Sequence, residues 1–132
     1  MRLLFLDTKA NNPNRYISRA VFNALRRDPR VRDVVWVGYA NALQVALDGV
    51  FDALVAFDGE EAGNPIVEQL CSLVPRHAIW FTEDPFEYYR NARVAKLFDL
   101  AFTNDAGTAA KYGDAIHLPL AAACVPAAER GR

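Results

Sequence analysis

Six apolar runs recur along the sequence, and they constrain the fold more than any other feature of the chain. Each run holds four to six apolar positions and then stops at polar or turn residues. Hydrophobicity that is continuous rather than alternating is typical of strands buried on both faces, as in a parallel sheet. The runs lie at residues 2–7, 33–39, 52–59, 77–84, 99–105 and 115–120.

Segments with helical spacing separate these runs. Apolar residues recur three or four positions apart within residues 16–25, 43–50 and 66–74. Asn64-Pro65 predicts where the third of these helices starts, and Asp84 is expected to cap a further helix, with Glu87 at capping-box spacing. Strand and helix therefore alternate five times. This order predicts an α/β fold: an open, doubly wound, mostly parallel, Rossmann-like sheet of about six strands with helices on both faces.

Length and composition predict one domain. The chain has 132 residues, of which 52% are hydrophobic. We expect residues 1–120 to form the domain and residues 121–132 to be a linker or frayed tail toward a missing C-terminal domain. A formal net charge of −1 gives no electrostatic case for nucleic acid. The first apolar run is too short for a signal peptide or a membrane span, so a soluble cytoplasmic protein is expected.

Reactive side chains are few. Cys71 and Cys124 are far apart and lack metal-ligand spacing, so structural thiols and no metal site are expected. His77 and His117 are expected to play structural roles away from the ligand-binding edge of the sheet. Ser18 lies in a predicted helix with no visible partner. These features do not favour nucleophilic catalysis.

Polar residues follow the predicted strands, and ligands of open α/β sheets bind at that edge. The edge is acidic, so it does not favour a free phosphate. Aromatic residues follow Asp84, and asparagines occupy the first strand–helix loop. The candidate ligand-binding residues are Asp7, Asn11, Asn12, Asp58, Glu83, Asp84, Tyr88, Asn104 and Asp105. Several of them also have a plain structural interpretation: Asn104 or Asp105 as a helix cap, Asp58–Gly59 as a turn, and Tyr88 as a packing residue.

The same residues bear on other functions. The first loop, "DTKANNPNR", contains no glycine, which argues against a bound dinucleotide, and no cofactor is expected. A phospho-receiver domain would use Asp7, Asp58 and Thr82, but Asn104 and Asp105 stand where a lysine is needed. A receiver-like or protein-interaction module remains the main alternative, and a flavodoxin-like ligand-binding domain stays open.

The last third of the chain carries a family resemblance. Its elements are an aromatic strand ending in an acidic-Pro turn (Trp80–Pro85), an "FDLAFTND" strand (98–105), a "YG" helix end (112–113) and an "LPLAA" segment (118–122). Together they resemble the N-terminal half of bacterial glycosyltransferases related to the spore maturation protein CgeB. Glu83 stands where the family pattern leads us to expect an aspartate.

The resemblance implies the acceptor-side domain of a GT-B glycosyltransferase. In that architecture the N-terminal domain receives a sugar or glycan acceptor, and a C-terminal domain binds most of the nucleotide-sugar donor. That second domain is not contained in these residues, so activity of this chain alone is not expected. An inverting transfer needs a general base near the acceptor hydroxyl, and Glu83, Asp84 and Asp7 are the candidates. A homodimer is a further possibility for the isolated domain.

Overall fold

The computed structural model describes residues 1–7, 11–58 and 65–120, and these residues alternate strictly between strand and helix. The strands are β1 (Arg2–Leu6), β2 (Asp33–Val37), β3 (Ala53–Phe57), β4 (His77–Phe81), β5 (Leu100–Thr103) and β6 (Ile116–His117). The helices are α1 (Arg15–Arg27), α2 (Tyr39–Asp48), α3 (Pro65–Leu73), α4 (Tyr88–Ala95) and α5 (Ala106–Tyr112). Each predicted apolar run therefore contains one strand, which confirms the predicted order of elements.

One sheet holds all these strands, in the order β2-β1-β3-β4-β5-β6. Each neighbouring pair is parallel, so the mostly parallel sheet predicted from the sequence is confirmed and is wholly parallel across the described residues. The chain moves to one side of β1 to form β2 and then returns to the other side to form β3. The strand order therefore reverses between β1 and β3.

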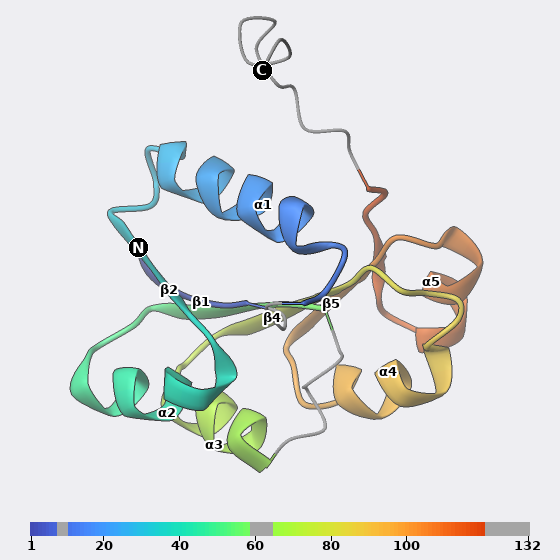
Figure 1. The fold of residues 1–132 in the computed structure, drawn as a ribbon. Helices are drawn as coiled ribbons and strands as arrows, with labels where there is room; N and C mark the ends of the chain where they lie inside the picture. The colour runs from blue at the N-terminus through green and yellow to red at the C-terminus, as the bar shows by residue number, and fades with distance from the viewer. Residues whose placement is uncertain (8–10, 59–64, 121–132) are drawn as a thin grey trace, which may run out of the picture.

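Two hydrophobic cores of unequal size lie on opposite faces of the sheet, and helices cover both faces (Figure 1). The larger core joins the sheet to residues of α2, α3 and α4, with Tyr112 of α5 packed against it. The smaller core joins the sheet to α1 alone among the described helices, through Ile17, Val21, Phe22 and Leu25. Helices on both faces confirm the doubly wound architecture.

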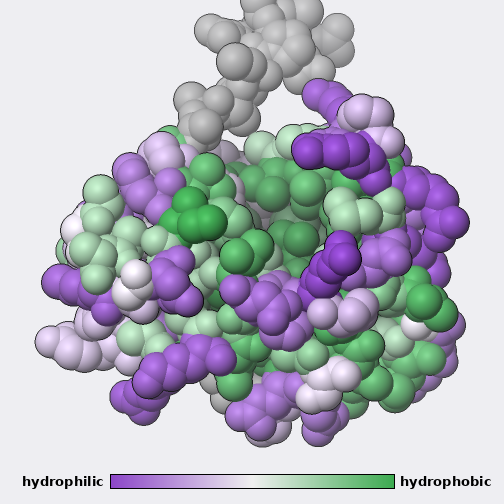
Figure 2. Space-filling model, turned by 180° about the vertical axis from the view of Figure 1, so that it is seen from behind, coloured by the Kyte–Doolittle hydropathy of each residue, from purple (hydrophilic) through white to green (hydrophobic). Residues whose placement is uncertain are grey.

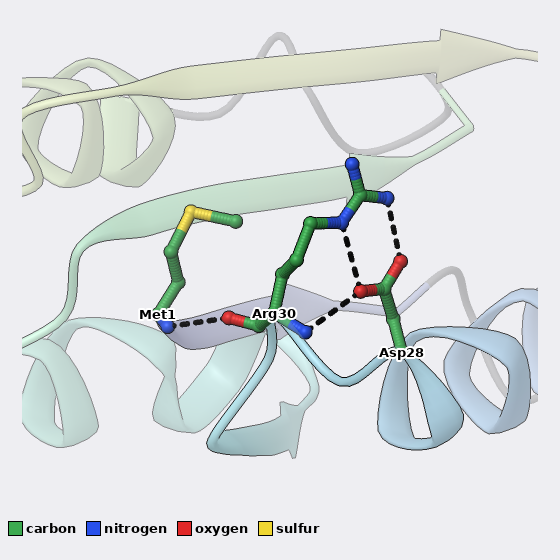
Figure 3. A network of polar contacts seen from close by, with 3 residues as sticks. All are labelled: Met1, Asp28 and Arg30. Atoms are coloured by element: carbon green, nitrogen blue, oxygen red, sulfur yellow. Dashed lines mark hydrogen bonds and ion pairs between the residues drawn. The ribbon is translucent and has the colours of Figure 1, made fainter.

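A small polar network fixes the turn between α1 and β2 (Figure 3). The Arg30 guanidinium donates to both carboxylate oxygens of Asp28, at 2.9 and 2.6 Å, and the Arg30 backbone N–H donates to the same carboxylate. These hydrogen bonds lower the pKa of Asp28 to about 2. The Met1 ammonium donates to the Arg30 carbonyl at 2.7 Å, which ties the turn to the start of β1.

Helix starts differ from the sequence prediction in one place. Helix α4 begins at Tyr88 and its N-cap residue is Glu87, which makes no capping hydrogen bond through its side chain. The expectation that Asp84 caps this helix is therefore wrong, because the chain makes a further turn between Asp84 and Tyr88. Helix α5 does begin after a capping residue, Asp105, as one of the alternatives predicted. Residue 64, the predicted cap of α3, lies outside the described residues.

Within the described ranges, no helix combines the length and the apolar character needed to cross a bilayer.

Candidate functional site

The reversal of strand order places a potential binding site at the carboxyl ends of β1 and β3. The chain leaves β1 toward α1 on one face and leaves β3 toward α3 on the other, so the connections diverge at this point. Open α/β sheets bind ligands in the crevice that such a divergence creates. Asp7 follows β1 and Asp58 follows β3. Their backbone N–H groups donate to the carbonyls of Val37 and Trp80, at 2.9 and 2.8 Å, so both residues are held in line with the sheet.

The Asp7 carboxylate is held by the first turn of α1. It is 3% exposed, and its Oδ1 accepts a hydrogen bond from the Ser18 hydroxyl at 2.5 Å. Its Oδ2 lies 3.4 Å from Nε of Arg15. No partner for Ser18 is visible in the sequence, and the structure supplies one. Arg15 and Ser18 are three residues apart, so the sequence alone already places both side chains on one face of the helix.

Two asparagines of the first loop connect Asp58 to the end of β4. The Asn12 side chain donates to Asp58 Oδ2 at 2.9 Å. Asn12 also accepts from the Asn14 backbone N–H at 2.7 Å. The Asn14 side chain then donates to Glu83 and, at 3.4 Å, to the Thr82 hydroxyl.

These residues form what we call the switch-point cluster. Its members are Asp7, Asn12, Asn14, Asp58, Thr82 and Glu83. Carboxylate, amide and hydroxyl groups from three loops thus gather at one edge of the sheet. Asn14 was not identified from the sequence, since an asparagine in a loop has turn-forming roles that hide a role in a site.

Two unusual features lie in this region: the backbone conformation of Asp58 and the buried hydroxyl of Tyr39. Asp58 has a φ of 65°, a left-handed conformation that is uncommon for a residue with a side chain. The Tyr39 hydroxyl is buried and has no hydrogen-bond partner among the described residues, while the whole residue is 9% exposed. Burial raises the pKa of Tyr39 far above its ordinary value, and the charges of Asp58 and Asp7 raise it further. The hydroxyl therefore lies within electrostatic range of both carboxylates.

Asp84 belongs to a different cluster on the α4–α5 side. Its carboxylate is 3% exposed and accepts hydrogen bonds from the side chains of Asn91 (2.9 Å), Thr103 (2.7 Å) and Tyr112 (2.9 and 3.1 Å). We call these four residues the Asp84 network. Burial raises the pKa of Tyr112 strongly, and its hydrogen bond to Asp84 adds to the effect. Three donors occupy this carboxylate, so its geometry is that of a structural link between α4, β5 and α5.

The remaining candidates lie outside the switch-point cluster. Asp105 accepts from the backbone N–H and the hydroxyl of Thr108, both at 2.7 Å, and these bonds lower the pKa of Asp105. Asn104 is half-buried, and its side-chain oxygen has no hydrogen-bond partner among the described residues. Tyr88 packs against Tyr112, with ring centroids 5.2 Å apart.

Tyr88 also lines a pocket of about 480 Å³ beneath β5, together with Lys96 and Lys111. Asn11 is exposed in the first loop.

The histidines divide between the two ends of the sheet. His77 opens β4, and its Nδ1 accepts from the backbone N–H of Asp99 at 3.0 Å, which agrees with a structural role at the amino end. His117 closes β6 opposite Thr103, so it lies at the carboxyl end. The expectation that both histidines lie away from that edge is wrong for His117. The cause is that β6 ends at His117, three residues earlier than the predicted run.

In the described part of the chain, no three His, Cys, Asp or Glu side chains are grouped so as to hold a metal ion. The switch-point cluster presents carboxylates, amides and a hydroxyl, which can exchange hydrogen bonds and protons with a ligand. No family model, curated protein or solved structure matches the chain.

Proposed function

We propose that this domain binds a sugar or glycan acceptor and forms the acceptor-side half of a GT-B glycosyltransferase. The observation that carries the proposal is the switch-point cluster, in which carboxylates, amides and a hydroxyl from three loops meet at the carboxyl edge of the sheet. A sugar hydroxyl both donates and accepts hydrogen bonds. It therefore matches an edge where carboxylates and amides lie side by side.

Glu83 has the best position for a general base. It is half-exposed, whereas Asp7 and Asp58 are buried, and a base must come within hydrogen-bond reach of the acceptor hydroxyl. Asn14 donates to Glu83 and so orients its carboxylate. Asp7 and Asp58 would position the loop and the acceptor. Asp84 has no part in this scheme, since three donors already bind its carboxylate.

In this proposal a C-terminal domain binds the nucleotide-sugar donor and closes over the same edge. The isolated chain is expected to bind acceptors without transferring sugar. Acceptor binding is therefore the property to test.

The test is a panel of mono- and oligosaccharides screened against the chain by saturation-transfer NMR. We expect at least one class of sugar to bind and Glu83→Ala to abolish or strongly weaken that binding. Glu87→Ala is the matched control, because Glu87 is also half-exposed and lies four residues away, where it pairs with Arg90. Equal loss in both variants, or no binding across the panel, would contradict the proposal.

A phospho-receiver function is the second candidate. The strand order is one that receivers share, and Asp7, Asp58 and Thr82 follow β1, β3 and β4. Against it, Asn104 follows β5 where a lysine is required, and Asp58 is 1% exposed. Incubation with acetyl phosphate and Mg²⁺ separates the two candidates. A phosphoryl group on Asp58, detected by mass spectrometry and lost in Asp58→Asn, would favour the receiver.

A further inference from the structure

Helices α4 and α5 lie side by side on the face of the sheet that carries the larger core (Figure 1). Both helices line the pocket of about 480 Å³ beneath β5, together with residues 98–99 before β5 and Asp114 before β6. Pockets of about 300–1,000 Å³ commonly hold small-molecule ligands. None of the residues that line it belongs to the switch-point cluster, so it is a separate cavity, which we call the α4–α5 pocket.

The buried part of the α4–α5 pocket is apolar and aromatic. Phe98 and Ala101 are 8% and 9% exposed, and they form its floor. Tyr88 and Tyr112 also line it, with ring centroids 5.2 Å apart. The Tyr112 hydroxyl donates to Asp84 at 2.9 Å and so has a partner within the protein. The rings are therefore what this part of the pocket presents, and they suit an aromatic group of a ligand.

The rim of the pocket carries charges of both signs. Lys96 and Lys111 line it together with Asp99 and Asp114, and all four residues are exposed. At the end of α4, and again at the end of α5, an aspartate follows a lysine by three residues. Lys111 Nζ lies 5.5 Å from the centre of the Tyr88 ring, which places an ammonium group at the aromatic wall.

These rim charges are available to a ligand. Among the described residues, no carboxylate lies within 4.0 Å of the ammonium group of either lysine. A ligand with a single charge would meet two rim groups of like sign, whichever charge it carried. A zwitterion finds a partner of opposite sign for each of its charges.

We propose that the α4–α5 pocket binds an amino acid with an aromatic side chain. The ring of the ligand packs against the aromatic walls and floor, its carboxylate faces the two lysines, and its ammonium group faces the two aspartates. Each part of the ligand thus meets a group that the pocket presents. The proposal does not depend on the glycosyltransferase function.

An apolar groove on the face of the smaller core is the competing place for an aromatic ring. Its volume is about 420 Å³, and its lining includes Val55, Trp80, Phe102 and Leu118. Figure 2 shows the molecule from behind, where apolar side chains gather in a hollow with polar side chains around it. Asp28 is the charged residue in the lining of the groove, so charges of both signs are not available to a ligand there.

The test is a titration of the ¹⁵N-labelled chain with L-phenylalanine, followed by NMR. We expect the amide signals of Ala92, Ala95, Lys111 and Asp114 to move and those of Trp80 to stay. Two matched compounds isolate the charges: 3-phenylpropionate lacks the ammonium group, and phenethylamine lacks the carboxylate. Each should bind at least about tenfold more weakly than L-phenylalanine, because one charged hydrogen-bonding group is lost.

Variants give an independent check. Replacing both rim lysines, Lys96→Gln with Lys111→Gln, should weaken L-phenylalanine binding at least about tenfold for the same reason. The matched control is Arg19→Gln with Arg27→Gln, which removes the same charge from exposed positions on α1 and should leave binding unchanged. Ala92→Leu fills the pocket from α4 with a good helix former and should abolish binding while the circular dichroism spectrum is retained.

Three results would overturn the proposal. Equal binding of 3-phenylpropionate or phenethylamine would show that the rim does not select a zwitterion. Shifts confined to Trp80 and Phe102 would place the ring in the groove instead. The third is an absence of shifts with both L-phenylalanine and L-tryptophan up to their solubility limits.

Discussion

At the scale of single residues, two buried carboxylates in this domain have different surroundings. Asp7 belongs to the switch-point cluster and is held by residues of one helical turn. Asp84 is bound by side chains from three separate elements. A buried carboxylate with several donors stabilises the fold only while all of its partners remain, because a lost partner leaves polar groups buried without hydrogen bonds.

Asp84→Ala is therefore expected to destabilise the domain by about 3 kcal/mol or more, since three donors would be left unpaired. Tyr112→Phe removes one donor and should cost about 1 kcal/mol. Urea unfolding followed by circular dichroism measures both values. Asp114→Ala is the control, because Asp114 is exposed and its replacement should stay within about 0.5 kcal/mol of the parent protein. An Asp84→Ala variant as stable as the parent protein would show that the Asp84 network contributes little to stability.

The alkaline pH dependence of stability also belongs to single residues. Burial raises the pKa of Cys71 from 9.0 to about 11, and the pKa values of Tyr39 and Tyr112 are raised above 10 for the same reason. A group whose pKa is raised by folding stabilises the protein below its unfolded pKa, and that contribution is lost as pH rises through the folded value. Stability should therefore decline from about pH 9 upward.

Urea midpoints measured between pH 9 and 11 test this expectation. Cys71→Ala should show a shallower decline across that interval, because the thiol no longer titrates. In that variant, the loss of stability caused by ionisation of the two tyrosines should remain above pH 10. A midpoint that stays constant from pH 9 to 11 in the parent protein would contradict the argument.

At the scale of elements, helix ends depend on backbone conformation that composition reveals only in part. Gly113 ends α5 with a φ of 91°, which favours glycine over residues with a Cβ. Gly38 precedes α2 with a φ of −85°, and a Cβ there would meet no atom within 4 Å. The backbone conformation at Gly113 therefore favours glycine, whereas the conformation at Gly38 suits other residues as well.

Gly113→Ala should destabilise the domain by about 1 kcal/mol, the cost of a left-handed residue with a Cβ. Gly38→Ala should be neutral or slightly stabilising, since it restricts only the unfolded chain. Thermal unfolding of the two variants side by side gives the comparison. Equal shifts in both would indicate that the backbone conformation at Gly113 does not matter for stability.

The order of elements could be predicted from the sequence, but the partners of polar residues could not. Continuous apolar runs revealed each strand, because a strand covered on both faces needs apolar side chains at every position. Asp84 was predicted to cap a helix from its place before Pro85, yet it bonds with Thr103 and Tyr112, which are 19 and 28 residues away. Contacts of that separation depend on tertiary packing, which local spacing does not encode.

At the scale of the whole molecule, the two faces of the sheet and its carboxyl edge have separate roles. One face is covered by several helices, and the other leaves an apolar groove beside the point where the described chain ends. The polar switch-point cluster lies at the edge between them. Sugar hydroxyls need hydrogen-bond partners, so the polar edge rather than the apolar groove is the place where a soluble acceptor is expected to bind.

The central claim is that the acceptor binds at the switch-point cluster, and NMR shift mapping of the ¹⁵N-labelled chain tests it most directly. The chain is titrated with the sugar that binds best in the panel, and the amide signals that move are assigned. We predict that the moving signals are those of Asn12, Asn14, Thr82 and Glu83. Shifts confined to the residues around Tyr88 and Lys111, or to the groove beside Trp80, would contradict the account and place the ligand elsewhere.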